Sequence, residues 1–289
     1  MSDNENSEIP TSSTARTAEN WSFRIPTKLI KKQTLYLPIR LADGTLRAPA
    51  PPTIAIPLEL LSDPGVARLV DDEYLGDGFE NFERNYLLQH LRSGDYLIDI
   101  GAHFGLYSIF ASASVQDLQC LALEPHPANF KVLETSIKHS GLESRIKGLQ
   151  CALGDRNTTG KLRINSSMGH HLINDDSREF DVIDTPVHRL DTLIKRFKLG
   201  QSASRIWLKI DTEGRESSVL SGAAELLGSG KVLGVLWESS VGPLENPANK
   251  GIELFLRRFG FSTKKISPHS MFSTLYKRAS QALPDDASA

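Results

Sequence analysis

Acidic side chains and glycines follow two short apolar runs that are typical of buried strands. The first run, YLIDI at 96–100, contains Asp99 and leads into a glycine turn made of Gly101, Ala102, His103, Phe104 and Gly105. The second run, CLALE at 120–124, ends at Glu124, with Pro125 after it. In open α/β sheets, ligands bind beyond the carboxyl ends of strands, and an acid there can accept both hydroxyls of a ribose. We therefore expect a ligand site here, the structural alternatives being a plain strand–helix turn and an acid that favours a helix N-terminus.

A second acidic group follows the apolar run IWLKI at 206–210. Its acids are Asp211, Glu213 and Glu216, and the cations Lys209 and Arg215 lie beside them. Glu238 ends a further apolar run, VLGVLWE, at 232–238. Carboxylates that are buried together raise one another's pKa, which suits a general base working near neutral pH. The alternative is that Asp211 and Glu213 only cap the next helix and pair with Lys209 or Arg215.

Other residue types that bind metals or move protons give weaker patterns. Asp211 and Glu238 are suitable ligands for a hard divalent cation, but no clear third ligand follows, so no metal site is predicted. His170 and His171 are adjacent, so on a strand at most one would enter a cleft. Either could act as a base for a hydroxyl group, but we favour an exposed loop position. Cys120 and Cys151 lie in apolar runs and are expected to be reduced core thiols.

Strand-like and helix-like segments alternate through most of the chain. The expected strands are 96–100, 120–124, 146–153, 206–210 and 232–238, with two final strands after Gly260. The expected helices are 80–93, 106–114, 127–140, 190–197, 216–227 and 252–260, and 161–188 is expected to be an insertion of short strands and loop. This alternation predicts a doubly wound, mostly parallel, Rossmann-like α/β sheet covered on both faces.

The regions outside this alternation differ in composition. Residues 1–20 and 281–289 are expected to be disordered tails, because they carry too little apolar surface to offset ordering entropy. Residues 21–78 are expected to form an N-terminal extension with short strands, which contacts the substrate or another subunit. Residues 79–280 are expected to form the main domain.

Bulk composition excludes some partners and locations. The 289 residues carry a net charge of −2, which argues against a nucleic-acid partner. No run of 18 apolar residues is present, and the first residues lack the apolar segment of a secretory signal. We therefore expect a cytoplasmic protein with no membrane span, and a homodimer is left open.

Six segments resemble one family in order and spacing, over roughly residues 80–277. They are IDIGAHFGLYS, ALEPHPANFKVL, CALGD, VHRLDTL, LKIDTEGRESSVLSGA and VLWE. They are similar to the FkbM-type methyltransferases, and LKIDTEGRESSVLSGA is the most specific of them. The resemblance implies a class I methyltransferase fold with S-adenosyl-L-methionine as the methyl donor.

The resemblance also implies roles for individual residues. Asp99, Gly101, Ala102, His103 and Gly105 would line the methionine end of the donor. Glu124, with Pro125 beside it, would hold the ribose, and Asp155 would lie near the adenine. The family usually carries Asn at the position of His103, whose imidazole can still make one hydrogen bond.

The acidic group after 206–210 would then face the acceptor. Asp211 is the first candidate for orienting or deprotonating it, and Glu213 and Glu238 are the second. The implied acceptor is a hydroxyl of a sugar, glycan or secondary metabolite. Two alternatives remain open: a nicotinamide-dependent oxidoreductase, disfavoured because no GxGxxG is present, and a non-catalytic binding protein with the same fold.

Overall fold

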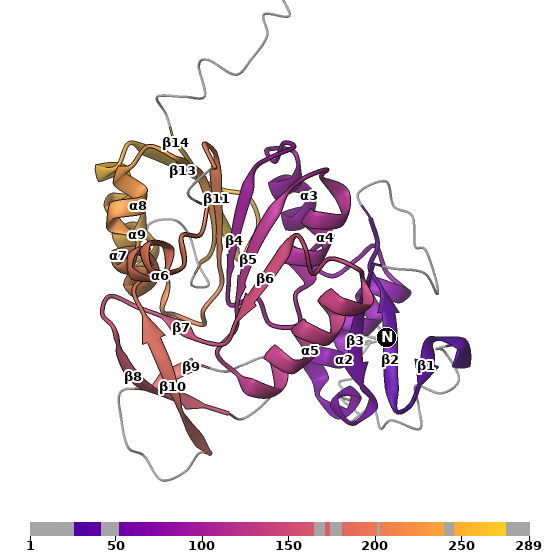
Figure 1. Ribbon diagram of the computed structural model, residues 1–289. Coiled ribbons are helices and arrows are strands. Elements are labelled where there is room, and N and C mark those ends of the chain that lie inside the picture. Colours follow the sequence, from indigo (N-terminus) through magenta and orange to yellow (C-terminus); the bar gives the residue numbers. More distant parts are fainter. Residues whose placement is uncertain are drawn as a thin grey trace, which may run out of the picture.

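Five buried apolar strands form the parallel centre of a seven-stranded sheet (Figure 1). The computed structural model describes residues 26–41, 52–164, 171–173, 181–200, 203–239 and 246–275, and the predicted tails lie outside these ranges. The parallel strands are β4 (Tyr96–Ile100), β5 (Gln119–Leu123), β6 (Ile146–Leu149), β11 (Ile206–Ile210) and β12 (Val232–Glu238). The antiparallel edge consists of β14 (Ser270–Leu275) and β13 (Phe261–Lys265). The predicted fold class is confirmed.

The strand order fixes where a ligand can bind. The order is β13-β14-β12-β11-β4-β5-β6, so the chain builds outward from β4 through β5 and β6, then returns to place β11 on the other side of β4. In doubly wound sheets a crevice opens at this reversal, beyond the carboxyl ends of the strands. The segments that follow β4, β5 and β11 meet there.

Helices cover both faces of the sheet (Figure 1). One face carries α3 (Asn81–Leu88), α4 (Leu106–Ser114) and α5 (Pro127–His139). The other carries α6 (Leu190–Phe197), α7 (Glu216–Gly222), α8 (Ala224–Gly228) and α9 (Pro247–Arg258). Successive strand residues point to opposite faces, so Leu97 and Ile98 of β4 belong to different buried clusters. The continuous apolar runs are explained by this two-sided burial.

The predicted strand 146–153 is wrong in its second half. The chain leaves the sheet after β6 at the exposed residue Gln150, and Ala152–Leu153 form a separate strand, β7. Strand β7 pairs with β10 (Val182–His188), which also pairs with β8 (Thr158–Arg163), and β9 (His171–Ile173) completes this second, four-stranded sheet. An apolar run shows that a segment is buried, but it does not show which strand it pairs with.

The predicted helix 216–227 is divided at Ala223. The backbone N–H groups of Glu225 and Leu226 donate to the buried carboxylate of Asp191, at 3.1 and 3.0 Å. This carboxylate from α6 satisfies N–H groups that the start of a helix leaves unpaired, so α8 begins as a new helix. The capping residue lies far away in sequence, which hides the break from a local pattern.

The predicted N-terminal strands are present and attached to the main sheet's helices. They are β1 (Ile30–Lys31), β2 (Thr34–Pro38) and β3 (Thr53–Pro57), preceded by the 3₁₀ turn Thr27–Leu29 and followed by a second, Leu58–Ser62, and helix α2 (Pro64–Tyr74). The outer edge of β3 meets α5, where the Ala55 and Thr53 N–H groups donate to the hydroxyls of Ser136 and Ser140. These serines satisfy an edge that would otherwise be unpaired. Among the described helices, none is long and apolar enough to cross a membrane.

The contact between Gly222 and Gly154 gives a test of how α7 packs against the segment after β7. A side chain at Gly222 would overlap the carbonyl oxygen of Gly154, next to β7. We expect Gly222→Ala to destabilise the protein by about 1–3 kcal/mol, the cost of overpacking. Gly251→Ala is the matched control, because Gly251 lies in α9 with nothing within 4 Å of an added methyl, and alanine there stabilises a helix. Urea unfolding of both variants measures the difference, and equal midpoints would contradict the contact.

Candidate functional site

The turn after β4 requires both of its glycines for reasons of packing. Gly101 has a φ of +76°, and a side chain there would overlap the carbonyl oxygen of Asp211. Gly105 has a φ of +88°, and a side chain there would overlap Leu133 of α5. Both glycines let the turn approach β11 and α5 closely, with left-handed φ values that other residues rarely adopt.

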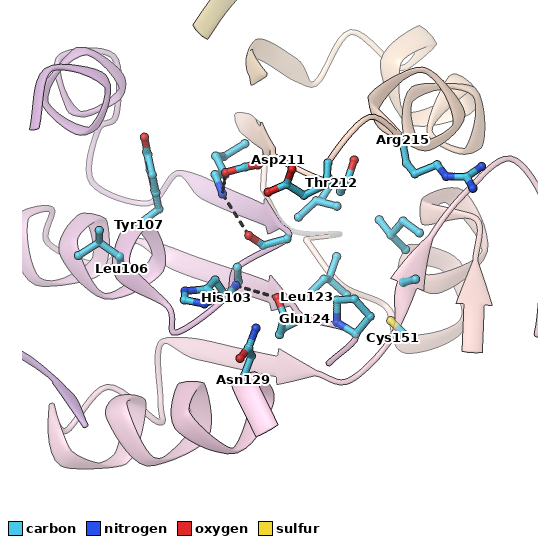
Figure 2. A pocket seen from close by; sticks show the side chains of 18 of the residues that line it. His103, Leu106, Tyr107, Leu123, Glu124, Asn129, Cys151, Asp211, Thr212 and Arg215 are labelled. Atoms are coloured by element: carbon cyan, nitrogen blue, oxygen red, sulfur yellow. Dashed lines mark hydrogen bonds and ion pairs between the residues drawn. The ribbon is translucent and has the colours of Figure 1, made fainter. Parts of the chain in front are cut away.

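Glu124 is fixed by the backbone of the same turn. Its Oε2 accepts a hydrogen bond from the His103 N–H at 2.8 Å (Figure 2). Its Oε1 accepts one from the His126 N–H at 2.9 Å. The residue is only 5% exposed, and this burial raises the pKa of Glu124 to about 7 despite the two N–H donors. A carboxylate oxygen accepts more than one hydrogen bond, so both oxygens keep capacity toward a ligand.

His103 fits the backbone conformation of its position. Its φ is +51°, in the left-handed region that Asn, Asp and His enter more readily than most residues. The imidazole stacks on Phe104, with ring centroids 3.7 Å apart. His103 therefore adopts the backbone conformation of this turn, in which its N–H group donates to Glu124.

A cavity of about 1030 Å³, its open mouth included, lies above this turn. Seven of the predicted site residues line it: Gly101, Ala102, His103, Glu124, Pro125, Asp211 and Glu213. The rest of the wall includes an apolar group, namely Leu69, Phe79, Leu106, Cys151, Ala152, Leu153 and Leu162. Figure 2 shows that Tyr107 and Cys151 lie on opposite sides of this cavity, with Glu124 between them.

Four predicted residues lie outside the cavity lining. Asp99 is fully buried beneath the turn, where its Oδ2 accepts hydrogen bonds from the Ser108 N–H and hydroxyl, at 3.1 and 2.6 Å. Gly105 is the packing glycine described above. Asp155 lies at the surface, with its carboxylate 3.2 Å from Arg156. Glu238 is half-buried at the end of β12 and is hydrogen-bonded to Asp211. Their roles toward a ligand stay predictions.

The Lys209 ammonium joins the two halves of the site. It donates to the Gly101 carbonyl at 3.1 Å and lies 3.3 Å from Asp211 Oδ2 and 3.6 Å from Asp99 Oδ1. The side chain is 7% exposed. Burial opposes its charge, but the nearby charges of Asp211, Asp99 and Glu80 prevail and raise the pKa of Lys209.

Two carboxyl groups near Asp211, those of Glu238 and Glu213, have raised pKa values. Burial, the charge of Asp211 and a hydrogen bond with it raise the pKa of Glu238 to about 9, so Glu238 holds a proton at neutral pH. Burial and the charges of Asp211 and Glu216 also raise the pKa of Glu213. These shifts match the expectation that carboxylates here raise one another's pKa.

Within the described residues, no side chain makes a capping hydrogen bond at the start of α7, so Asp211 and Glu213 do not cap it, although Asp211 does pair with Lys209. Glu216 Oε1 accepts hydrogen bonds from the Thr212 N–H and hydroxyl, both at 3.0 Å, and from the Gly214 N–H at 3.2 Å. The loop between β11 and α7 is therefore ordered by Glu216. This arrangement leaves Asp211 and Glu213 on the cavity wall.

Two cavity residues were missed from the sequence. Glu80 and Tyr107 line the cavity and are hydrogen-bonded to each other. Desolvation beside the cavity and the charge of Asp211 raise the pKa of Glu80, although the residue as a whole is exposed. Tyr107 lay within a predicted helix, where nothing in the sequence marked it as a site residue. Glu80 does not follow a strand, so the search for acids at strand ends did not select it.

Of the remaining histidine and cysteine candidates that the structure describes, Cys151 alone lines the cavity. His170 lies outside the described residues, and His171 lies on β9 with its side chain outside them. Cys120 and Cys151 are both buried free thiols, as predicted, although Cys151 lies between β6 and β7 instead of on a strand. In the described part of the chain, no group of three His, Cys, Asp or Glu residues is placed to hold a metal.

The central position of Lys209 gives a stability test. Lys209→Met would leave the buried carboxylate of Asp99 without its cation, and we expect a loss of about 3–5 kcal/mol, as for other broken buried pairs. Lys195→Met is the control, because its partner Glu225 is 60% exposed and that pair contributes little. Urea unfolding at pH 7 measures both, and a similar small effect for the two variants would contradict a central role for Lys209.

Comparison with known proteins places the chain in a family. A family model described as the methyltransferase FkbM domain matches residues 99–263. The methyltransferase sdnD of Sordaria araneosa is 26% identical over 167 residues, which cover 48% of this chain and 64% of that protein. The chain thus matches less than two thirds of this relative.

Solved structures overlap the chain only partly. Fibrillarin from Aeropyrum pernix, in complex with natively bound S-adenosyl-L-methionine, has a TM-score of 0.40 and 13% identity, covering 65% of this chain and 71% of its own. A protein of the NADB-Rossmann superfamily from Streptococcus agalactiae has a TM-score of 0.41 and 11% identity, covering 67% of each chain. The family match extends from the buried Asp99 through the acidic segment after β11 to the last strands. The chain therefore belongs to the FkbM methyltransferase family, whose methyl donor is S-adenosyl-L-methionine.

Proposed function

We propose that this protein transfers a methyl group from S-adenosyl-L-methionine to a hydroxyl group of a sugar, glycan or secondary metabolite. The observation that carries the proposal is the placement of Glu124. Its buried carboxylate is held by two backbone N–H groups at the wall of the cavity, beyond the carboxyl end of β5. Ribose-binding acids occupy this place in related nucleoside sites.

The cavity walls fit the parts of the donor. Glu124 would accept hydrogen bonds from the two ribose hydroxyls, which are donors of the kind that a carboxylate binds. Pro125, Ala152 and Leu153 form an apolar wall near it, suited to the flat face of an adenine. The turn from Gly101 to His103 would hold the methionine part. Asp155 is proposed for the adenine on the family resemblance alone.

The chain's own contribution to the reaction is alignment and proton removal. When bound, the donor supplies a methyl group activated by a positively charged sulfur. Holding the acceptor hydroxyl in line with that methyl can lower the barrier by about 7–11 kcal/mol. Asp211 would accept the hydrogen bond of the acceptor hydroxyl and take its proton as the new C–O bond forms and the bond from sulfur to the methyl carbon breaks, leaving S-adenosylhomocysteine. Such a base adds about 10²–10⁴-fold to the rate.

The neighbours of Asp211 set its position. Lys209 holds one of its oxygens, and Glu238 shares a hydrogen bond with it. Glu213 is the second candidate base, because it also lines the cavity. Glu238 would act through Asp211 as a positioning residue, since it does not reach the cavity.

Binding of S-adenosylhomocysteine should depend on pH through Glu124. The ionised carboxylate is the better acceptor for ribose hydroxyls, and the pKa of Glu124 is raised to about 7. Affinity should therefore rise roughly tenfold between pH 6 and pH 8, as the ionised fraction grows. Glu124→Gln should bind more weakly and lose this dependence, whereas Glu143→Gln, at an exposed position of the described chain, should keep it. Titration calorimetry measures all three, and an unchanged affinity in Glu124→Gln would reject the assigned site.

Substitution of Asp211 should separate chemistry from donor binding. We expect Asp211→Asn to lower turnover by about 10²–10⁴-fold, the contribution of a positioned base, with a smaller change in S-adenosylhomocysteine affinity. Acceptors would first be found by incubating the protein with S-adenosyl-L-methionine and panels of sugars, glycans and hydroxylated metabolites. Mass spectrometry would detect products heavier by one CH₂ group. If Asp211→Asn keeps its turnover and Glu213→Gln loses it, Glu213 is the base.

A further inference from the structure

A buried ion pair clamps the turn between α2 and α3. The side chains of Glu73 and Arg84 are both 0% exposed, with Glu73 Oε1 and Arg84 Nη2 2.5 Å apart. Glu73 Oε1 also accepts the Phe79 N–H, and its Oε2 accepts the Arg40 N–H, both at 2.9 Å. A buried ion pair with additional hydrogen bonds holds the surrounding backbone in one conformation. Removing either partner would leave the other as an unpaired buried charge, which is strongly destabilising.

The clamped turn is held in an uncommon conformation. Gly78 has a φ of +108°, and a methyl group there would lie 2.5 Å from Arg84 Nη2. Glu80 has a φ of +49°, in the left-handed region, although it is not glycine. Such residues persist where their surroundings determine them, and they are frequent at ligand sites. The consequence is that Phe79 and Glu80 become part of the cavity wall.

Glu80 lies at one end of the cavity. Its carboxylate is hydrogen-bonded to Tyr107, which Figure 2 places on the side opposite Cys151. A nucleoside held by Glu124, with its base toward the wall at Cys151, would extend its remaining part toward Tyr107. The other acid at this end, Asp211, is already paired with Lys209.

We propose that Glu80 binds the α-ammonium group of the methionine part of S-adenosyl-L-methionine, and that the Glu73–Arg84 pair positions it to do so. An ammonium group has three donors and no acceptor, so it requires an acceptor such as a carboxylate. The inference rests on the proposed function. It also extends the donor site beyond residues 99–263, the region that the family model matches.

Two nucleosides separate the ammonium contact from the rest of the site. S-adenosylhomocysteine carries the α-ammonium group, and 5′-methylthioadenosine lacks the amino-acid part. We expect Glu80→Gln to weaken S-adenosylhomocysteine roughly 10- to 100-fold, the range for a hydrogen bond to a charged group, and to leave 5′-methylthioadenosine unchanged. Glu83→Gln is the matched control, because it removes the same charge from α3 without lining the cavity. Titration calorimetry on the full chain measures each pair.

A second variant tests the clamp. Gly78→Ala should displace the turn through its φ and its contact with Arg84, and should reproduce the selective loss of S-adenosylhomocysteine seen in Glu80→Gln. The far-ultraviolet circular dichroism of both variants should match that of the unaltered protein. An effect of Gly78→Ala equal for both nucleosides would overturn the positioning role.

The remaining outcomes distinguish the inference from the function on which it rests. If Glu80→Gln changes both nucleosides equally or neither, Glu80 does not bind the ammonium group. If it weakens S-adenosyl-L-methionine but not S-adenosylhomocysteine, Glu80 faces the sulfonium and the proposal is wrong. If the unaltered protein binds neither nucleoside, the donor site itself is refuted, whatever the variants show.

Discussion

The contact of Lys209 with both halves of the sheet is the constraint on which the site depends. Its ammonium group reaches the carbonyl of Gly101 after β4 and the carboxylate of Asp211 after β11. These two segments lie on the two sides of the reversal of strand order, where the crevice forms. The contact of Lys209 with both segments fixes their separation. The contact requires close backbone approach, and Gly101 permits it because any side chain would overlap the Asp211 carbonyl. Lys209 and Gly101 together thus form the floor of the cavity, which is the part of its wall between β4 and β11.

The carboxylates around this floor fall into two physical kinds. Glu124 and Glu216 accept several hydrogen bonds from backbone N–H groups, so their positions are fixed by the chain itself. Asp211 and Glu213 instead face the cavity near Lys209. Carboxylates fixed by the backbone suit recognition, which needs constant geometry, whereas those beside other acids suit proton transfer. Glu216 shows that an acid in a catalytic-looking motif can be a loop-ordering residue.

The sequence predicted what depends on local pattern. Buried strands such as 96–100 and 206–210 were located because two-sided burial produces continuous apolar runs, and the acids that follow them could be placed at one edge of the sheet. Pairing and capping could not be predicted in this way. The division of 146–153 depends on β10, and the start of α8 depends on Asp191, both distant in sequence. Glu80 was missed because its turn is held by contacts between α2 and α3, such as the buried Glu73–Arg84 pair, that a local pattern does not show.

The charge of the cavity bears on which ligand it retains. Acidic residues on its wall include Glu80, Glu124, Asp211 and Glu213, against the cations Lys209 and Arg215. Coulomb interactions are stronger in such an enclosed site than in water, so an excess of acids favours a ligand with positive charge. S-adenosyl-L-methionine carries a sulfonium that S-adenosylhomocysteine lacks. The raised pKa of Glu80 and Glu124 limits this excess at neutral pH, because a partly protonated carboxyl group carries less negative charge. A cationic donor would favour the ionised forms of these acids. Binding of the donor would therefore be coupled to the release of protons.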